Sequence, residues 1–165
     1  MTFIAITSAV LAFAAQGHGT KTSDEMLQIA FLKGSWSGKQ NFNVPNGTMV
    51  GDATDSIQDA VGGRYIEERL STTLPGRTPT DTRHFIAYDP ADGKFKAWWF
   101  NDTTVGPMEL EGSLSGTVLT LESKPSAKRI FRAVYTKVSD SNLTFGLFLK
   151  NGSNWQSLFI TTYTK

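Results

Sequence analysis

The pattern of apolar and polar residues changes once along the chain, close to Gly34. Before this glycine, apolar residues recur at helical spacing: Met26, Leu27, Ala30 and Phe31. Ser23 is placed to cap the start of that segment. After Gly34, apolar and polar residues alternate with a period of two, which is typical of strands with one buried face. The sequence therefore predicts a short helix that ends at Gly34, followed by strands.

About ten segments with strand character follow the helix, and most are joined by short turns rich in Gly, Asn, Asp and Pro. Their approximate ranges are 35–43, 48–60, 64–73, 82–88, 94–100, 108–114, 117–122, 128–138, 143–150 and 154–165. Sequential strands joined by hairpins predict an all-β fold, an antiparallel up-and-down β-barrel of about ten strands with a short N-terminal helix. A β-sandwich is the alternative, but the long connections that would favour it are few.

The hairpin at residues 86–102 sets the expected orientation of the aromatic side chains, because it carries two adjacent tryptophans. Neighbouring strand residues point to opposite faces of a sheet. Trp99 shares its face with two small or apolar residues, Phe95 and Ala97, whereas Trp98 shares its face with lysines. We therefore expect Trp99 to face the interior and Trp98 to cover the outer surface.

The N-terminus differs from the rest of the chain. Residues 3–15 form an apolar run without a charge, too short for a spanning helix but of the length of a signal-peptide core. Ala12-Phe13-Ala14 fits a cleavage site, although no basic residue precedes the run. We interpret 1–15 as a signal peptide, 16–22 as a linker and 23–165 as one barrel domain. This predicts a periplasmic or secreted protein without a stable membrane span; a buried N-terminal helix, or a true start further upstream, is the alternative.

The composition limits the kinds of site and partner that the chain can have. The chain of 165 residues has 39% apolar and 19% charged residues, which suits one folded domain. A formal net charge of +1 gives no electrostatic reason to expect nucleic acid. With no Cys and two His, thiolate sites are excluded and a multi-histidine metal site is not expected. We predict no cofactor.

The predicted interior contains aromatic residues that could line a pocket and two charged residues that could anchor a polar group. The expected ligand-binding residues are Trp36, Phe42, Glu68, Phe95, Trp99, Arg132, Phe145 and Phe159. Arg132 is either a clamp for an acidic ligand or a residue at the rim. Glu68 is either buried with a partner such as Arg64 or Arg132, or solvated on the outer face.

His84 lies on a predicted strand and allows two interpretations. It could contact a ligand or act as a general base in the interior. The more ordinary interpretation, which we favour from the sequence, is a histidine that is exposed or hydrogen-bonded for structural reasons. No nucleophile stands at a diagnostic spacing from it, so we assign no catalytic residue.

The stretch FLKGSWSGKQ, residues 31–40, resembles the start of barrels of the calycin superfamily, which includes lipocalins, fatty-acid-binding proteins and nitrobindin-like barrels. In those families a Trp on the first strand closes one barrel end, and a basic residue packs over it. The resemblance implies that Trp36 takes this place, with Lys165, Lys128 or Arg132 as its partner. Nitrobindin-like barrels hold haem through a late His, which this chain lacks, since no His follows His84.

A closer resemblance is to a family of bacterial, often exported, lipocalin-like domains without an assigned function. Its landmarks occur here in the family's order as GGRYIEE, AYDPADGKFKAWW, ELEGSL and TTYTK, so that the resemblance covers residues 27–165. It implies the barrel fold and says little of activity, since one fold hosts many functions.

The sequence as a whole favours an exported lipocalin-like barrel that binds a small hydrophobic or amphipathic molecule in its interior. Two alternatives stay open. One is a small isomerase or lyase that uses Glu68, Arg64 or His84 as an acid or base. The other is a structural envelope protein whose barrel is filled by side chains. The sequence predicts no oligomeric state.

Overall fold

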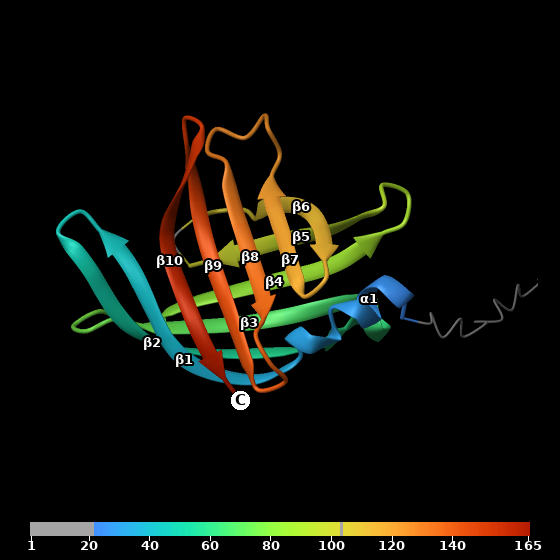
Figure 1. The fold of residues 1–165 in the computed structure, drawn as a ribbon, viewed down its shortest axis with the longest axis horizontal. Coiled ribbons are helices and arrows are strands. Elements are labelled where there is room, and N and C mark those ends of the chain that lie inside the picture. Colours follow the sequence, from blue (N-terminus) through green and yellow to red (C-terminus); the bar gives the residue numbers. More distant parts are fainter. Residues whose placement is uncertain (1–21, 103) are drawn as a thin grey trace, which may run out of the picture.

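A closed antiparallel barrel of ten strands is formed by the residues that the computed structural model describes, 22–102 and 104–165 (Figure 1). Each strand pairs with its neighbour in sequence, and β1 pairs with β10 to close the barrel. The strands are β1 Gly34–Val44, β2 Gly47–Ala60, β3 Tyr65–Thr73, β4 Thr80–Asp89, β5 Lys94–Asn101, β6 Met108–Ser115, β7 Val118–Ser123, β8 Phe131–Lys137, β9 Asn142–Asn151 and β10 Asn154–Thr164. The predicted all-β barrel is confirmed. The predicted signal peptide and most of the linker lie outside the described residues.

A short helical segment covers one end of the barrel. It consists of α1, Asp24–Gln28, and a 3₁₀ turn, η1, Ala30–Leu32; a second 3₁₀ turn, η2, Val61–Gly63, links β2 to β3. The Ser23 hydroxyl accepts a hydrogen bond from the Met26 backbone N–H at 3.2 Å, as expected of an N-cap. Three apolar side chains of the segment are buried in the core: Met26, Ile29 and Leu32. The predicted single helix ending at Gly34 is instead the short helix α1 followed by the turn η1, and together they cover one end of the barrel.

Trp36 and Lys165 complete this closed end. The Trp36 indole Nε1 donates a hydrogen bond to the Leu32 carbonyl oxygen at 2.7 Å. The Lys165 Nζ lies 4.6 Å from the centroid of the Trp36 ring, within range of a cation–π interaction. Of the three basic residues considered from the sequence, Lys165 is the one that packs over Trp36.

The register of the β4–β5 hairpin is as predicted. Trp99 is buried, whereas Trp98 is half-buried on the outer surface, where its ring lies 6.0 Å from that of Tyr65. On β8, however, the inward residues are Ala133 and Tyr135, so the side chain of the intervening Arg132 is on the outer face.

The expectation of an inward-facing Arg132 is therefore wrong. Its guanidinium stacks 3.8 Å from the Trp155 ring centroid and forms an ion pair with Glu122 at 2.7 Å. The sequence showed Arg132 among apolar neighbours, but those neighbours belong to the outer face. An Arg stem that covers an exposed aromatic ring explains the apolar surroundings.

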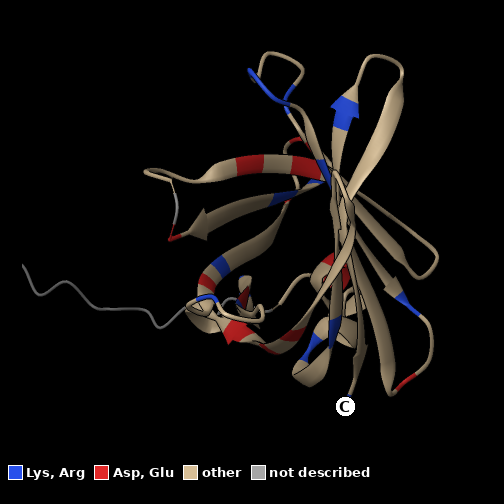
Figure 2. Ribbon diagram, turned by 90° about the vertical axis from the view of Figure 1, so that its left-hand side faces the viewer, with Lys and Arg blue, Asp and Glu red and all other residues tan. Residues whose placement is uncertain are grey.

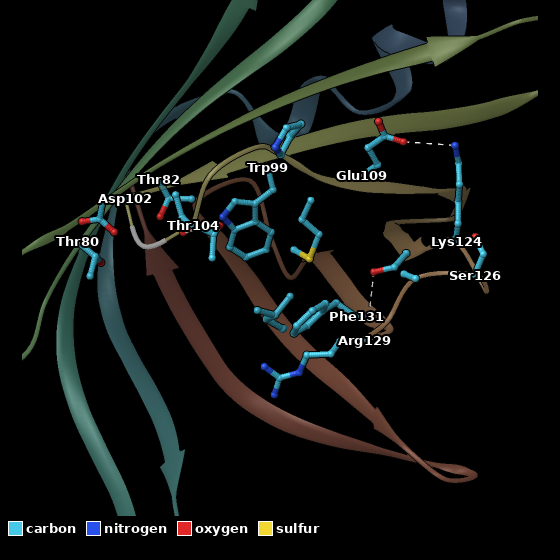
Figure 3. A pocket seen from close by; sticks show the side chains of 16 residues that line it. Thr80, Thr82, Trp99, Asp102, Thr104, Glu109, Lys124, Ser126, Arg129 and Phe131 are labelled. Carbon is cyan, nitrogen blue, oxygen red and sulfur yellow. Dashed lines mark hydrogen bonds and ion pairs between the residues drawn. The ribbon is translucent and has the colours of Figure 1, made fainter.

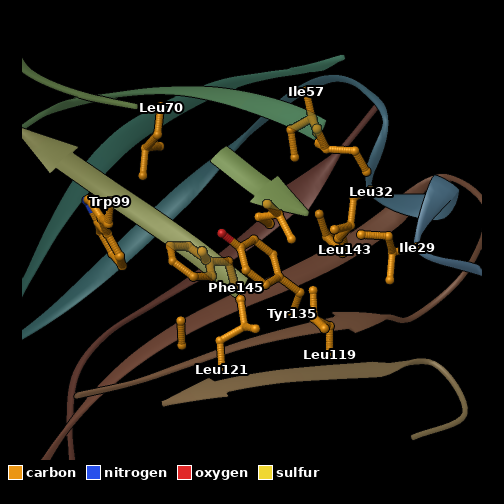
Figure 4. Close-up of a cluster of buried hydrophobic side chains, with 14 of the residues drawn as sticks. Ile29, Leu32, Ile57, Leu70, Trp99, Leu119, Leu121, Tyr135, Leu143 and Phe145 are labelled. Atoms are coloured by element: carbon orange, nitrogen blue, oxygen red, sulfur yellow. The ribbon is translucent and has the colours of Figure 1, made fainter. Parts of the chain in front are cut away.

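The hydrophobic core extends inside the barrel from the helical segment to Trp99 (Figure 4). The rings of Tyr135 and Phe145 are stacked at 4.5 Å in the centre of it. Ile29 and Leu32 approach from the helical side, and Trp99 lies at the opposite edge of the cluster.

The seam between β1 and β10 requires a residue without a side chain. Gly38 lies opposite Tyr163 in this pairing, and a Cβ atom at position 38 would lie 2.0 Å from the Thr162 carbonyl oxygen. The obstacle is backbone, which cannot move without disturbing the closure of the barrel.

We expect Gly38→Ala to lower the free energy of unfolding by about 1–3 kcal/mol, because the added methyl group forces the seam apart. Ser37→Ala is the matched control, since this neighbour is exposed, and it should stay within about 0.5 kcal/mol of wild type. Urea unfolding followed by circular dichroism measures both. Equal stability of the two variants would contradict the proposed close approach.

Candidate functional site

A pocket of about 600 Å³ opens at the end of the barrel opposite the helical segment (Figure 3). It is formed by the first residues of β4, β6 and β8, the last residues of β5 and β7, and the connecting loops, whereas α1 lies beside the last residues of β4. Its lining residues are Thr80, Thr82, Trp99, Asn101, Asp102, Thr104, Pro107, Met108, Glu109, Ser123, Lys124, Ser126, Ala127, Arg129, Phe131 and Leu147.

The pocket is apolar inside and polar at its edge. The apolar part is made by Trp99, Met108, Phe131 and Leu147. Charged side chains of both signs stand around it, and Lys124 forms an ion pair with Glu109 at 3.3 Å. Charges of both signs are also mixed along the barrel as a whole (Figure 2). An apolar wall with polar groups at its edge is the usual composition of a small-molecule site.

A cluster of buried polar side chains lies behind Trp99. The His84 ring centroid is 3.9 Å from that of Trp99, and His84 Nδ1 is 2.6 Å from Glu68 Oε2. The Tyr135 hydroxyl donates to the same Glu68 oxygen at 2.5 Å and lies 3.0 Å from His84 Nδ1. Trp99 therefore both lines the pocket and packs against His84 of the polar cluster.

The barrel topology brings these side chains together. Glu68 on β3 and His84 on β4 are directly opposite each other in the strand pairing. Tyr135 comes from β8, and its hydroxyl reaches them across the interior. Asp55 on β2 and Tyr163 on β10 contribute two more buried polar groups.

One atom of the cluster stands out because it has no hydrogen-bond partner among the described residues: His84 Nε2. Leaving such a group buried and unpaired costs about 1–3 kcal/mol, and most buried polar groups in proteins are paired. The carboxyl groups of Asp55 and Glu68, by contrast, lie within hydrogen-bonding reach of each other when one of them carries a proton, and the side chains of Tyr163 and Thr161 are also hydrogen-bonded.

Burial dominates the titration of the cluster. It raises the pKa of Asp55 to about 10, assisted by the charge of the nearby Glu68. Burial also raises the pKa of Glu68, while its hydrogen bonds with Asp55 and Tyr135 act in the opposite direction. Burial lowers the pKa of His84 to about 3 and raises the pKa of both tyrosines. At neutral pH the imidazole is therefore neutral.

The hydrogen bonds indicate which of Glu68, Asp55 and His84 carry protons. Glu68 Oε2 receives two short bonds, which suits a carboxylate, so we assign the ionised form to Glu68 and the proton to Asp55. A neutral His84 that donates from Nδ1 to Glu68 carries no proton on Nε2. Nε2 is then a hydrogen-bond acceptor, which is the arrangement that a base needs. Among the described residues, no group of His, Asp or Glu is arranged to hold a metal ion.

The sequence-predicted ligand residues fall into three places. Trp99 lines the pocket. Five others are buried in the interior: Trp36, Glu68, Phe95, Phe145 and Phe159. Phe42 is half-buried, with its ring 5.4 Å from that of Phe159, and Arg132 is on the outer face. Their roles in ligand binding stay predictions.

The partners predicted for Glu68 are wrong. Its side chain bonds to His84 and Tyr135 rather than to Arg64 or Arg132, and it is fully buried. His84, which the sequence favoured as an ordinary strand residue, is buried at 3% exposure within the cluster. The strand pairing of Glu68 with His84 explains this contact, and pairing is not visible in a single strand's pattern.

Asp55 was missed from the sequence, although its signal was present. Residues 51, 53, 55 and 57 alternate with exposed residues, and the other three are Gly, Ala and Ile. That alternation places Asp55 on the buried face. Tyr135 and Tyr163 were missed as polar partners because a buried tyrosine is ordinarily packing.

Comparison with known families identifies the chain's relatives. Residues 21–165 match the family described as "Protein of unknown function (DUF1579)". The chain belongs to this family. The match covers the whole of the described barrel, and the family's description carries no activity. No curated protein matches the chain.

Solved structures with a similar fold include Rv2717c from M. tuberculosis, with a TM-score of 0.65 and 16% identity over 87% of this chain and 98% of that one. The S-type phycobiliprotein lyase CPES from Guillardia theta is similar at a TM-score of 0.52 and 6% identity, over 86% of this chain and 94% of that one. At these identities the similarity shows the fold alone. None of the helices in the described residues is long and apolar enough to cross a membrane.

We expect Asp55→Asn to stabilise the protein increasingly as the pH rises from about 4 to about 10. The raised pKa of Asp55 means that folding holds a proton which the unfolded chain releases above its ordinary pKa of 3.8. Wild type therefore loses stability across this range, whereas Asn, neutral at every pH, does not. Thermal unfolding of both proteins over this pH range measures the difference.

Asp52→Asn is the matched control, because Asp52 is exposed on the same strand and pairs with Lys39 at the surface. Its stability should stay within about 0.5 kcal/mol of wild type. A stability difference between Asp55→Asn and wild type that is constant with pH, or that shrinks as the pH rises, would show that Asp55 is not held protonated.

Proposed function

We propose that this barrel binds a small, partly apolar molecule at its open end. The observation that carries the proposal is the pocket of about 600 Å³ with its apolar wall of Trp99, Met108, Phe131 and Leu147. Its volume lies within the usual range of small-molecule sites, about 300–1,000 Å³. Such an opening does not fit a barrel that is filled by its own side chains.

The overall arrangement supports the same function. One end is closed by the helical segment and by Trp36 with Lys165, so that a ligand would enter from the other end. We propose that the barrel is calycin-like, on the strength of this closure and of the ten-strand topology. A barrel of similar fold is described as a phycobiliprotein lyase, which is in keeping with a small-molecule site in the present barrel.

Catalysis is the second candidate, and one observation favours it. Glu68 bonds to Nδ1 of a neutral His84, which is how a carboxylate orients a histidine base. An isomerase or lyase would need its substrate to reach His84, which is buried behind Trp99. We therefore rank binding above catalysis.

We expect Met108→Trp to weaken the binding of Nile red, a neutral apolar dye, by about ten-fold or more, because the indole would occupy the pocket. Fluorescence titration of the dye measures the affinity, and thermal unfolding checks that the fold is kept.

Val138→Trp serves as the control. Val138 is 63% exposed and follows β8 at the far end of the barrel, away from the pocket. This variant should bind the dye as wild type does. Equal affinities for all three proteins, or no binding by wild type, would refute the pocket as the ligand site.

Export is proposed from the sequence. The apolar run at residues 3–15 predicts that protein purified from its host begins near Ala15 or Gln16. Intact-mass spectrometry of the envelope and cytoplasmic fractions measures the mature chain. Recovery of the chain from the cytoplasm with Met1 still present would contradict export.

A further inference from the structure

The buried cluster behind Trp99 presents one acceptor that no residue uses. His84 Nε2 has no hydrogen-bond partner among the described residues, although only 3% of the residue is exposed. The opposite ring nitrogen is held by Glu68 and Tyr135, so the ring cannot turn to satisfy Nε2 without breaking two bonds. The acceptor is therefore fixed in place and unpaired.

One side chain contacts both the pocket and the histidine. Trp99 lines the pocket, and its ring centroid lies 3.9 Å from that of His84. The pocket wall also includes the apolar side chains of Leu147 and Met108 and the buried hydroxyl of Thr82.

We propose that His84 Nε2 is the polar anchor of the ligand site, and that it takes a hydrogen bond from a neutral hydroxyl or N–H group on an apolar ligand body when Trp99 turns aside. This inference rests on the proposed function and names the chemical class of its ligand. Glu68 is the positioning residue, since its carboxylate holds the Nδ1 proton and so leaves Nε2 as the acceptor.

The charge and burial of the cluster disfavour a charged ligand group at His84 Nε2. Around His84 stand Asp55, Glu68, Tyr135 and Tyr163, and with Glu68 ionised the group carries a negative charge and no cation. A carboxylate or phosphate placed at Nε2 would meet an acceptor and a like charge. A fully charged ammonium would have to lose its water in a buried site, which is costly. A neutral donor satisfies Nε2 without either penalty.

Two naphthalene derivatives of similar size test the proposal: 2-naphthol, which carries a hydroxyl donor, and 2-methylnaphthalene, which has none. His84→Phe removes the acceptor and keeps a planar ring. We expect this variant to bind 2-naphthol about five- to ten-fold more weakly than wild type, the value of one neutral hydrogen bond. Its affinity for 2-methylnaphthalene should change by less than about two-fold. Equilibrium dialysis measures each affinity.

Thr144→Val is the control, because Thr144 carries a hydroxyl on the outer face of β9 and does not line the pocket. It should leave both affinities unchanged. The acid 2-naphthoate provides a third compound, and its binding should not weaken in His84→Phe. A uniform loss for all three compounds in His84→Phe, or an equal loss of 2-naphthol affinity in Thr144→Val, would overturn the assignment to His84.

A measurement on wild type covers the case in which His84→Phe does not fold. Nitrogen-15 NMR should show the Nε2 resonance of His84 shifting when 2-naphthol is added, and staying in place with 2-methylnaphthalene. Binding of both compounds without any shift at Nε2 would refute this inference and leave the pocket as a ligand site. Failure of both compounds to bind at all would refute the inference and the proposed function together.

Discussion

Ionisable side chains buried inside the barrel impose the main constraint on this structure, because their charges must be neutralised or hydrogen-bonded. Asp55 and Glu68 lie in the interior at 3% and 0% exposure, and an isolated charge in such a place is very costly. The cost is reduced in two ways. Asp55 retains its proton, and Glu68 receives short hydrogen bonds from His84 and Tyr135. These bonds connect β3, β4 and β8 across the barrel, so the polar cluster also fixes how opposite walls of the barrel face each other.

The two ends of the barrel differ: one is closed and the other holds a pocket. Helical residues and Trp36, covered by Lys165, seal one end and complete the hydrophobic core. The other end keeps a pocket whose wall includes Trp99. Trp99 also packs on His84, so the same ring contacts the pocket and the polar cluster. Stability and the proposed ligand recognition thus converge on the same few side chains.

The sequence predicted the features that repeat along the chain. The alternation of strand residues and the turn residues gave the barrel, and the hairpin pattern placed Trp99 inside and Trp98 outside. Alternation alone did not show which face Arg132 lies on, because its apolar neighbours lie on the outer face, where its guanidinium stacks on Trp155. The polar cluster could not be derived in full, because Tyr135 reaches Glu68 from a strand 67 positions away. A pattern within one strand carries no information on such a contact. The alternation around Asp55 was present in the sequence, but the prediction did not use it.

The protonation state of His84 in the ligand-free protein tests the proposed cluster most directly. Long-range proton–nitrogen-15 NMR distinguishes the two neutral tautomers from the cation. We expect a neutral imidazole with its proton on Nδ1 from neutral pH down to about pH 4, because burial lowers the pKa of His84 to about 3. A doubly protonated ring near neutral pH, or a neutral ring with its proton on Nε2, would contradict the proton assignment on which the cluster and the proposed anchor depend.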